Sequence, residues 1–331
     1  MLRSRLFRLT LLFGVLLAVA APSVYAQERL SIATGGTGGV YYPYGGGLAN
    51  LLSEELPDYS FTAEVTSASV DNMYLIGDGD AAMAFVLADT AYDAAQGNDP
   101  FEEPIDAMAL ATLYNNFTQI VVDADAGIES IEDLAGTRVS TGSPGSGTEV
   151  IALRLMEVAG VTVDDIDQEQ LGAAESADAF RDGQIDAFFW SGGLPTAAIT
   201  DLAASPNSNM ALLPHGDLVD GLTEAYGEFY STATIPAETY PGQDEDVEVV
   251  VVANVLVVNA NMDEQLAYDV VRVMFENQDD LVAVHPAANE LTLENAMSSA
   301  ALEYHPGALR YFEEQGAGAS PVASPEATPA S

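Results

Sequence analysis

Thr34-Gly35-Gly36-Thr37-Gly38-Gly39-Val40-Tyr41-Tyr42 joins an apolar stretch at residues 29–34 to an amphipathic stretch at residues 40–56. This order predicts a strand, a glycine-rich turn and a helix, the unit from which α/β folds are built. Glycines let the backbone of the turn approach a ligand closely, and the start of the helix offers unpaired N–H groups and a partial positive charge. Tyr41 stands where a dinucleotide-binding turn has its third glycine, which disfavours a nucleotide site.

The same alternation continues toward the C-terminus and predicts two α/β units around mainly parallel sheets. In the first unit we expect strands at residues 29–34, 61–66 and 81–87 and helices at residues 40–56 and 70–77. In the second unit we expect a helical turn at residues 130–134, strands at residues 119–122, 137–140 and 185–190, and helices at residues 148–159 and 175–181.

A β-branched stretch at residues 247–258 is long enough to run from the second unit back to the first. Helices predicted at residues 263–277 and 306–315 would then complete the first unit. Two crossovers between lobes form a hinge and leave a ligand cleft between the lobes. We therefore predict an α/β, two-lobed periplasmic-binding-protein fold, type II-like, with a first lobe at residues 27–118 and 251–315 and a second lobe at residues 119–250.

The two ends of the chain are predicted to lie outside this fold. Residues 1–26 carry three arginines, an apolar run at residues 9–21 and small residues before a cleavage point after Ala26, the features of an export signal. The run is shorter than the roughly 20 residues that span a bilayer, and a retained membrane anchor is the alternative. Residues 316–331 are rich in Gly, Ala, Ser and Pro and predict a disordered tail. We expect a mature protein that is soluble in the periplasm.

Composition excludes several classes of function. The formal net charge is −42, which excludes nucleic acid and anionic lipid surfaces as partners. The chain has no cysteine, which removes disulfides, thiolate metal sites and a lipid anchor at the cleavage point. It has no lysine, which removes a Walker A site and a pyridoxal Schiff base. We expect a monomer with no catalytic residue, no cofactor and no metal.

Two further loops lie at predicted strand-to-helix junctions, where open α/β sheets place their ligands. Residues 142–148 have Thr148 at the position of a Walker lysine, so their amides and hydroxyls suit a carboxylate or another small oxyanion. A glycine-rich turn without function is the alternative there. In residues 67–72, Ser69 is either a ligand contact or a helix cap. Trp190, the single tryptophan, either walls the cleft or lies in the core.

No arginine occurs in these loops, so backbone amides, hydroxyls and helix ends would have to balance the charge of an anionic ligand. Hydrogen bonds to charged groups contribute about 1.5–3 kcal/mol each. Three or four of them, less the cost of ordering, reach the roughly −8 kcal/mol of micromolar binding.

Seven segments together resemble the TAXI family, the solute receptors of tripartite ATP-independent periplasmic (TRAP) transporters. They are residues 36–42, 69–72, 133–140, 142–148, 182–189, 235–240 and 305–312. The resemblance covers about residues 30–316 and implies a two-lobed fold that delivers a small anionic metabolite to the membrane subunits of a TRAP transporter, driven by an ion gradient. Ligands in such proteins are glutamate, glutamine and small dicarboxylates such as 2-oxoglutarate.

The resemblance also implies the residues that bind the ligand. Carried onto this sequence they are Gly36, Thr37, Gly39, Tyr42, Ser69, Val70, Asn72, Ser143, Pro144, Gly145, Ser146, Gly147, Thr148, Trp190 and Gly193. Leu87 departs from the pattern, because relatives often have a glutamine there, and this leaves the polar end of the pocket undefined.

Two other functions compete with a receptor. A secreted, bilobal, transferase-like enzyme has in its favour the many carboxylates, and against it the missing Lys and Cys and the scarcity of His. A surface or adhesion module without a pocket is the third interpretation.

Overall fold

The computed structural model describes residues 27–317, with the exception of residues 207 and 300. The predicted export signal, residues 1–26, lies outside the described residues, as does the predicted tail from residue 318 onward. Within the described part, no helix combines the length and the apolar composition needed to span a membrane.

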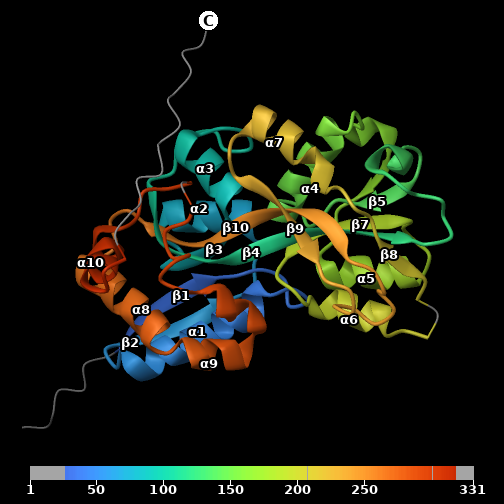
Figure 1. Ribbon diagram of the computed structural model, residues 1–331. Coiled ribbons are helices and arrows are strands. Elements are labelled where there is room, and N and C mark those ends of the chain that lie inside the picture. The colour runs from blue at the N-terminus through green and yellow to red at the C-terminus, as the bar shows by residue number, and fades with distance from the viewer. Residues whose placement is uncertain (1–26, 207, 300, 318–331) are drawn as a thin grey trace, which may run out of the picture.

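One mixed sheet runs through the whole molecule (Figure 1). Its main path has the order β2-β1-β3-β10-β4-β7-β5-β6, while β8 pairs with β4 and β9 with β10. The strands are β1 (Glu28–Ala33), β2 (Tyr59–Glu64), β3 (Met83–Leu87), β4 (Ala107–Asp123), β5 (Arg138–Ser140), β6 (Asp167–Glu169), β7 (Ala187–Gly192), β8 (Met210–Leu212), β9 (Tyr230–Ile235) and β10 (Val247–Asn259).

The prediction of mainly parallel sheets holds only for the outer strands. β1, β2 and β3 pair in parallel at one end, and β5, β6 and β7 do so at the other. The central strands β4 and β10 pair with each other and with their neighbouring strands in antiparallel fashion, and Ala109 of β4 adds one isolated parallel bridge to Tyr304. The reason is that each central strand crosses between the two lobes instead of returning through a helix to the same sheet edge.

The two crossing strands connect the lobes. β4 has 17 residues and β10 has 13, and they pair from Phe117 with Val251 to Ala107 with Asn259. β10 contains the β-branched run that the sequence analysis identified, whereas β4 was predicted only at residues 119–122. The lobe division predicted at residues 118 and 250 stays a prediction, and both positions lie inside these strands.

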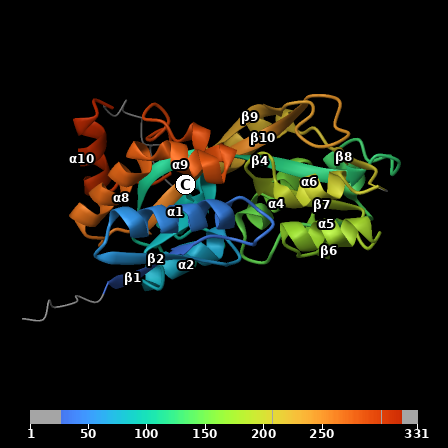
Figure 2. The same ribbon diagram turned by 90° about the horizontal axis from the view of Figure 1, so that it is seen from below.

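Helices cover both faces of the sheet (Figures 1 and 2). On one face, α2, α3, α4 and α7 share a hydrophobic core that is continuous through both lobes. On the other face the cores are separate, one under α1, α8, α9 and α10 and one under α5 and α6. The helices are α1 (Tyr41–Glu55), α2 (Ser69–Asp78), α3 (Ala88–Gln96), α4 (Gly147–Val158), α5 (Ala173–Arg181), α6 (Ala197–Ala203), α7 (Val219–Tyr226), α8 (Glu264–Glu276), α9 (Gln278–Val284) and α10 (Pro306–Glu314).

Candidate ligand-binding site

A cavity of about 70 Å³ lies where the two lobes meet. The first lobe lines it with residues 35–41, residues 67–69 and Leu87. The second lobe lines it with Ser143, residues 146–148, residues 172–175 and residues 190–192. Each of these segments lies at or just after the carboxyl end of a strand, as expected for an open α/β sheet.

Four helices begin at this cavity. α1 and α2 come from the first lobe and α4 and α5 from the second, and their first residues Tyr41, Ser69, Gly147 and Ala173 all line it. The first N–H groups of a helix have no partner within the helix and carry a partial positive charge. Four such ends around one small volume create a positive potential without a cationic side chain.

The side chains around the cavity supply hydroxyls but no positive charge. Glu175 is the one charged residue among those that line it, and its side chain is exposed. Five arginines of the described part are engaged in ion pairs with Asp or Glu, and none of them lines the cavity. An anion here would therefore be held by amides, hydroxyls and helix ends.

Backbone hydrogen bonds join the two lobes around the cavity. The N–H groups of Val70 and Asp71 donate to the carbonyl of Gly145 at 3.1 and 3.2 Å. The N–H of Ala198 donates to the carbonyl of Gly38 at 3.3 Å. The structure is therefore that of the closed arrangement, with the walls of the cavity in direct contact.

Two glycines allow this close approach. A Cβ on Gly39 would lie 2.6 Å from the Trp190 ring, and one on Gly147 would lie 2.6 Å from both Leu87 Cδ1 and Ser69 Oγ. Both contacts cross from one lobe to the other. The glycines of these turns thus let the two lobes close against each other as well as letting the backbone approach a ligand.

Trp190 and Ser191 form the wall contributed by β7. The Trp190 indole N–H donates to Thr196 Oγ1 at 2.9 Å, which fixes the ring against the cavity. The hydroxyl of Ser191 is buried and has no partner among the described residues. An unpartnered polar group in the lining of a cavity is explained most simply by a hydrogen bond to a ligand or to water.

The structure brings together many of the residues predicted to bind the ligand. Those that line the cavity are Gly36, Thr37, Gly39, Ser69, Ser143, Ser146, Gly147, Thr148 and Trp190. Ser69 does not act as a helix cap, because its Oγ accepts the Leu87 N–H at 3.1 Å instead. Ser146 is the N-cap of α4, and its side chain accepts the N–H of Glu149.

Three residues predicted in the first lobe lie outside the cavity lining. Tyr42 is 37% exposed on the surface of α1, one position away from its buried stripe. Val70 packs into the core that is shared by both lobes. Asn72 is fully buried, and its amide donates to the carbonyls of Thr34 and Phe85 while it accepts from Thr66, so it stabilises the loop rather than facing a ligand.

Three predicted residues of the second lobe also lie outside the lining. Pro144 and Gly145 belong to the turn before α4, and the Gly145 carbonyl is already bonded to α2. The Gly145 N–H donates to Glu149 Oε2 at 2.9 Å. Gly193 packs closely against Tyr114, Val40 and Ala287 of the first lobe.

Tyr41 and the segment at residues 172–175 line the cavity but were not among the residues predicted to bind the ligand. Tyr41 starts the buried stripe of α1, so the helical period of that stripe could have distinguished it from Tyr42. The cap residue Gly172 and the first residues of α5 face the cavity in the same way as the other helix starts. The only signal for them in the sequence was a glycine ahead of a predicted helix.

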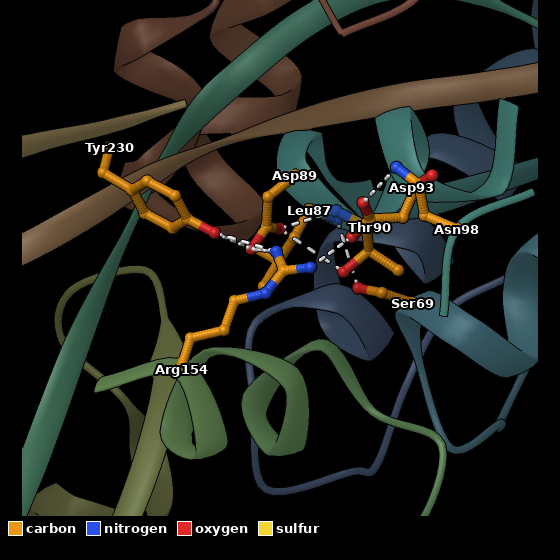
Figure 3. A network of polar contacts seen from close by, with 8 residues as sticks. All are labelled: Ser69, Leu87, Asp89, Thr90, Asp93, Asn98, Arg154 and Tyr230. Atoms are coloured by element: carbon orange, nitrogen blue, oxygen red, sulfur yellow. Dashed lines mark hydrogen bonds and ion pairs between the residues drawn. The ribbon is translucent and has the colours of Figure 1, made fainter. Parts of the chain in front are cut away.

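A buried ion network ties the lobes together next to the cavity (Figure 3). Arg154 of α4 contacts Asp89 at 3.1 Å and Asp93 at 2.5 Å, and both carboxylates belong to α3. Tyr230 of β9 bonds to both Arg154 and Asp89. Burial raises the pKa of Asp93, an effect that Arg154 opposes.

Residues 32–316 match the model of the NMT1-like family. Similar solved structures include a binding protein component of an ABC phosphonate transporter from Pseudomonas aeruginosa, with 11% identity over 79% of each chain and a TM-score of 0.53. PhnD1 from Prochlorococcus marinus, in complex with methylphosphonate, has 11% identity over 79% of this chain and 90% of that chain, with a TM-score of 0.52. At this level of identity the likeness shows the fold alone, and it confirms the predicted two-lobed class.

Proposed function

The chain belongs to the NMT1-like family, and we propose that it is an extracytoplasmic solute receptor of a transporter that binds a small carboxylate by closure of its two lobes. It is a binding protein rather than an enzyme, and it acts in the periplasm after loss of residues 1–26. Its partners are the ligand and the membrane subunits of the transporter.

One observation carries this proposal: four helix N-termini, two from each lobe, meet at one cavity that no cationic side chain of residues 27–317 lines. Because each lobe supplies two of the four helix N-termini, an anion binds more tightly to the closed form than to either lobe alone. Such differential affinity is what shifts an open–closed equilibrium.

The proposed ligands are glutamate, glutamine or a small dicarboxylate such as 2-oxoglutarate. The backbone amides and hydroxyls that line the cavity suit the carboxylates of such metabolites. A phosphonate is the competing anion, since the Prochlorococcus structure contains methylphosphonate.

The binding experiment uses the fluorescence of Trp190, the only tryptophan, which lines the cavity. We expect saturable quenching of the mature protein by at least one of L-glutamate, L-glutamine and 2-oxoglutarate, with a micromolar Kd and with the ligand recovered unchanged. Ser191→Ala, which removes the unpartnered hydroxyl, should weaken binding about tenfold. Ser205→Ala removes an exposed hydroxyl elsewhere and is the matched control.

The outcomes separate the candidate functions. Consumption of the ligand would favour the transferase-like enzyme, and the absence of binding to any small anion would contradict the receptor. Saturation by methylphosphonate alone would keep the receptor and replace the carboxylate.

We infer that the membrane partner is a TRAP transporter, because seven segments of the chain resemble TAXI receptors. Uptake into vesicles that contain TRAP membrane subunits should require this protein and an imposed ion gradient, without ATP. Uptake that needs ATP and the subunits of an ABC transporter would contradict it.

A further inference from the structure

Two asparagines of the hinge strands hold the hydroxyl of Tyr41. Asn254 Nδ2 of β10 lies 2.6 Å from the Tyr41 oxygen, and Asn116 Nδ2 of β4 lies 3.1 Å from it. Both asparagine side chains are fully buried. Tyr41 starts α1 and lines the cavity.

The hydrogen-bond chemistry sets the direction of these contacts. Asn254 Nδ2 also lies 3.2 Å from the carbonyl oxygen of Val86, which only accepts, so the nitrogen must occupy that position. Asn254 therefore donates to Tyr41, and Asn116 donates to it as well in the orientation that the structure shows. A phenol oxygen has two lone pairs, and both are then used. The Tyr41 hydroxyl can therefore make one further hydrogen bond, in which it is the donor.

Tyr41 lines the cavity together with Ser69. The Ser69 Oγ accepts the Leu87 N–H at 3.1 Å. Burial raises the pKa of Tyr41 above its ordinary range, so the hydroxyl stays protonated at physiological pH. The cavity thus faces O–H donors at this end, which suits an acceptor oxygen.

We propose that Tyr41 is a specificity-determining residue that donates its hydroxyl proton to an anionic oxygen of the ligand. Asn116 and Asn254 are positioning residues, because they donate to the hydroxyl oxygen and leave it no capacity to accept a hydrogen bond from the ligand. The site then selects ligands that present an oxygen acceptor to Tyr41 and rejects those that present an N–H. This inference rests on the proposed function.

The test titrates the mature protein with L-glutamate, 2-oxoglutarate and methylphosphonate by calorimetry. For the probe that the wild type binds most tightly, Tyr41→Phe should raise Kd about 10- to 100-fold, the range expected for a lost hydrogen bond to a charged group. Tyr44→Phe is the matched control, because the Tyr44 hydroxyl lies on the same helix, is buried without a partner among the described residues, and does not line the cavity. It should leave Kd within about twofold.

A double-mutant cycle separates positioning from a structural role. Asn116→Leu should raise Kd in the wild-type background and leave it unchanged in the Tyr41→Phe background, since its effect passes through the Tyr41 hydroxyl. A structural defect would raise Kd in both backgrounds. If Tyr41→Phe does not fold, Asn116→Leu alone carries the test, and an unchanged Kd overturns the inference.

The outcomes distinguish this inference from the proposed function. If Tyr41→Phe binds the ligand as tightly as the wild type, the Tyr41 proton is donated elsewhere, for example to a flipped Asn116 amide. That result would overturn this inference but would not contradict the proposal that the protein is a receptor. A wild type that binds none of the three probes would overturn both.

Discussion

His215 is a buried histidine with an unusual environment. Its side chain is 2% exposed, its Nδ1 contacts the carbonyl of Leu213 at 2.9 Å, and its Nε2 has no partner among the described residues. Burial lowers the pKa of His215 to about 4 from the ordinary value of 6.5, although Leu213 and Asp217 oppose the change. The native state therefore keeps this imidazole neutral, whereas the unfolded chain protonates it near pH 6.5.

This difference predicts that protein stability falls in acid. Between pH 6.5 and about 4 the unfolded state binds a proton that the native state does not, so the contribution of His215 is complete above pH 6.5 and is lost as the pH drops. The loss amounts to about 3 kcal/mol. Urea denaturation at pH 7 and pH 4 should show that the stability difference between wild type and His215→Gln shrinks by this amount. Parallel pH profiles for the two proteins would contradict it.

At the same scale, helical period explains which site residues the sequence could reveal. The buried stripe of α1 includes Tyr41, Tyr44 and Leu48, so Tyr41 faces inward and Tyr42 does not. Asn72 was misplaced for a different reason. Its three hydrogen bonds are made to residues distant along the chain or in a neighbouring loop, and no local pattern specifies such partners.

At the scale of elements, α3 of one lobe and α4 of the other are joined by ion pairs between side chains. Asp89 is fully buried, and Arg154 and Asp93 are nearly so. Removing one partner of a buried ion pair destabilises the protein strongly, because the remaining charge has neither water nor a partner around it.

Arg154→Met should therefore lower the free energy of unfolding by about 3–5 kcal/mol. Arg272→Met is the matched control, since Arg272 pairs with Asp269 and Glu276 on the surface of α8, and each such pair contributes no more than about 0.5 kcal/mol. Urea denaturation measures both. Adding Asp89→Asn and Asp93→Asn to Arg154→Met should recover most of the loss, and equal effects of the two single variants would contradict the argument.

The elements also show where sequence patterns fail. The glycine-bounded helices and the β-branched β10 were predicted closely, because glycine and valine carry strong local preferences. α3 was missed because it follows β3 without an intervening turn, so no boundary marks its start. The first half of β4 was missed because Ala107–Leu113 is rich in alanine and leucine, and its extended form comes from pairing with β10.

For the whole molecule, the two faces of the sheet differ in how they allow motion. The core under α2, α3, α4 and α7 is continuous through both lobes, while the cores of the other face are separate. A rotation that opens the cavity would bend β4 and β10, and it would move the start of α4 away from Leu87, a residue of the continuous core. The contacts that must separate include those of the glycine turns with Trp190, Ser69 and Leu87 and the backbone hydrogen bonds that Gly145 and Gly38 accept from the opposite lobe.

This geometry predicts that a single methyl group at Gly147 blocks closure. Its Cβ would lie 2.6 Å from Leu87 Cδ1 and Ser69 Oγ, so the lobes could not reach the closed arrangement without displacing these side chains. By small-angle scattering, the wild type should show a smaller radius of gyration with saturating ligand than without, whereas Gly147→Ala should stay near the larger value and bind more than tenfold more weakly.

Gly46→Ala provides the matched control for this experiment. Gly46 lies in α1, and a Cβ added there would meet no atom within 4 Å, so closure should be as in the wild type. The free energy of unfolding should rise by up to about 1 kcal/mol, because alanine has a higher helix propensity than glycine. Since Gly46→Ala alters the same residue type without entering the contact between lobes, a difference between the two variants isolates closure from folding. Compaction of Gly147→Ala to the wild-type value would show that the lobes close without this contact, and binding by closure around the glycine turns would then be wrong.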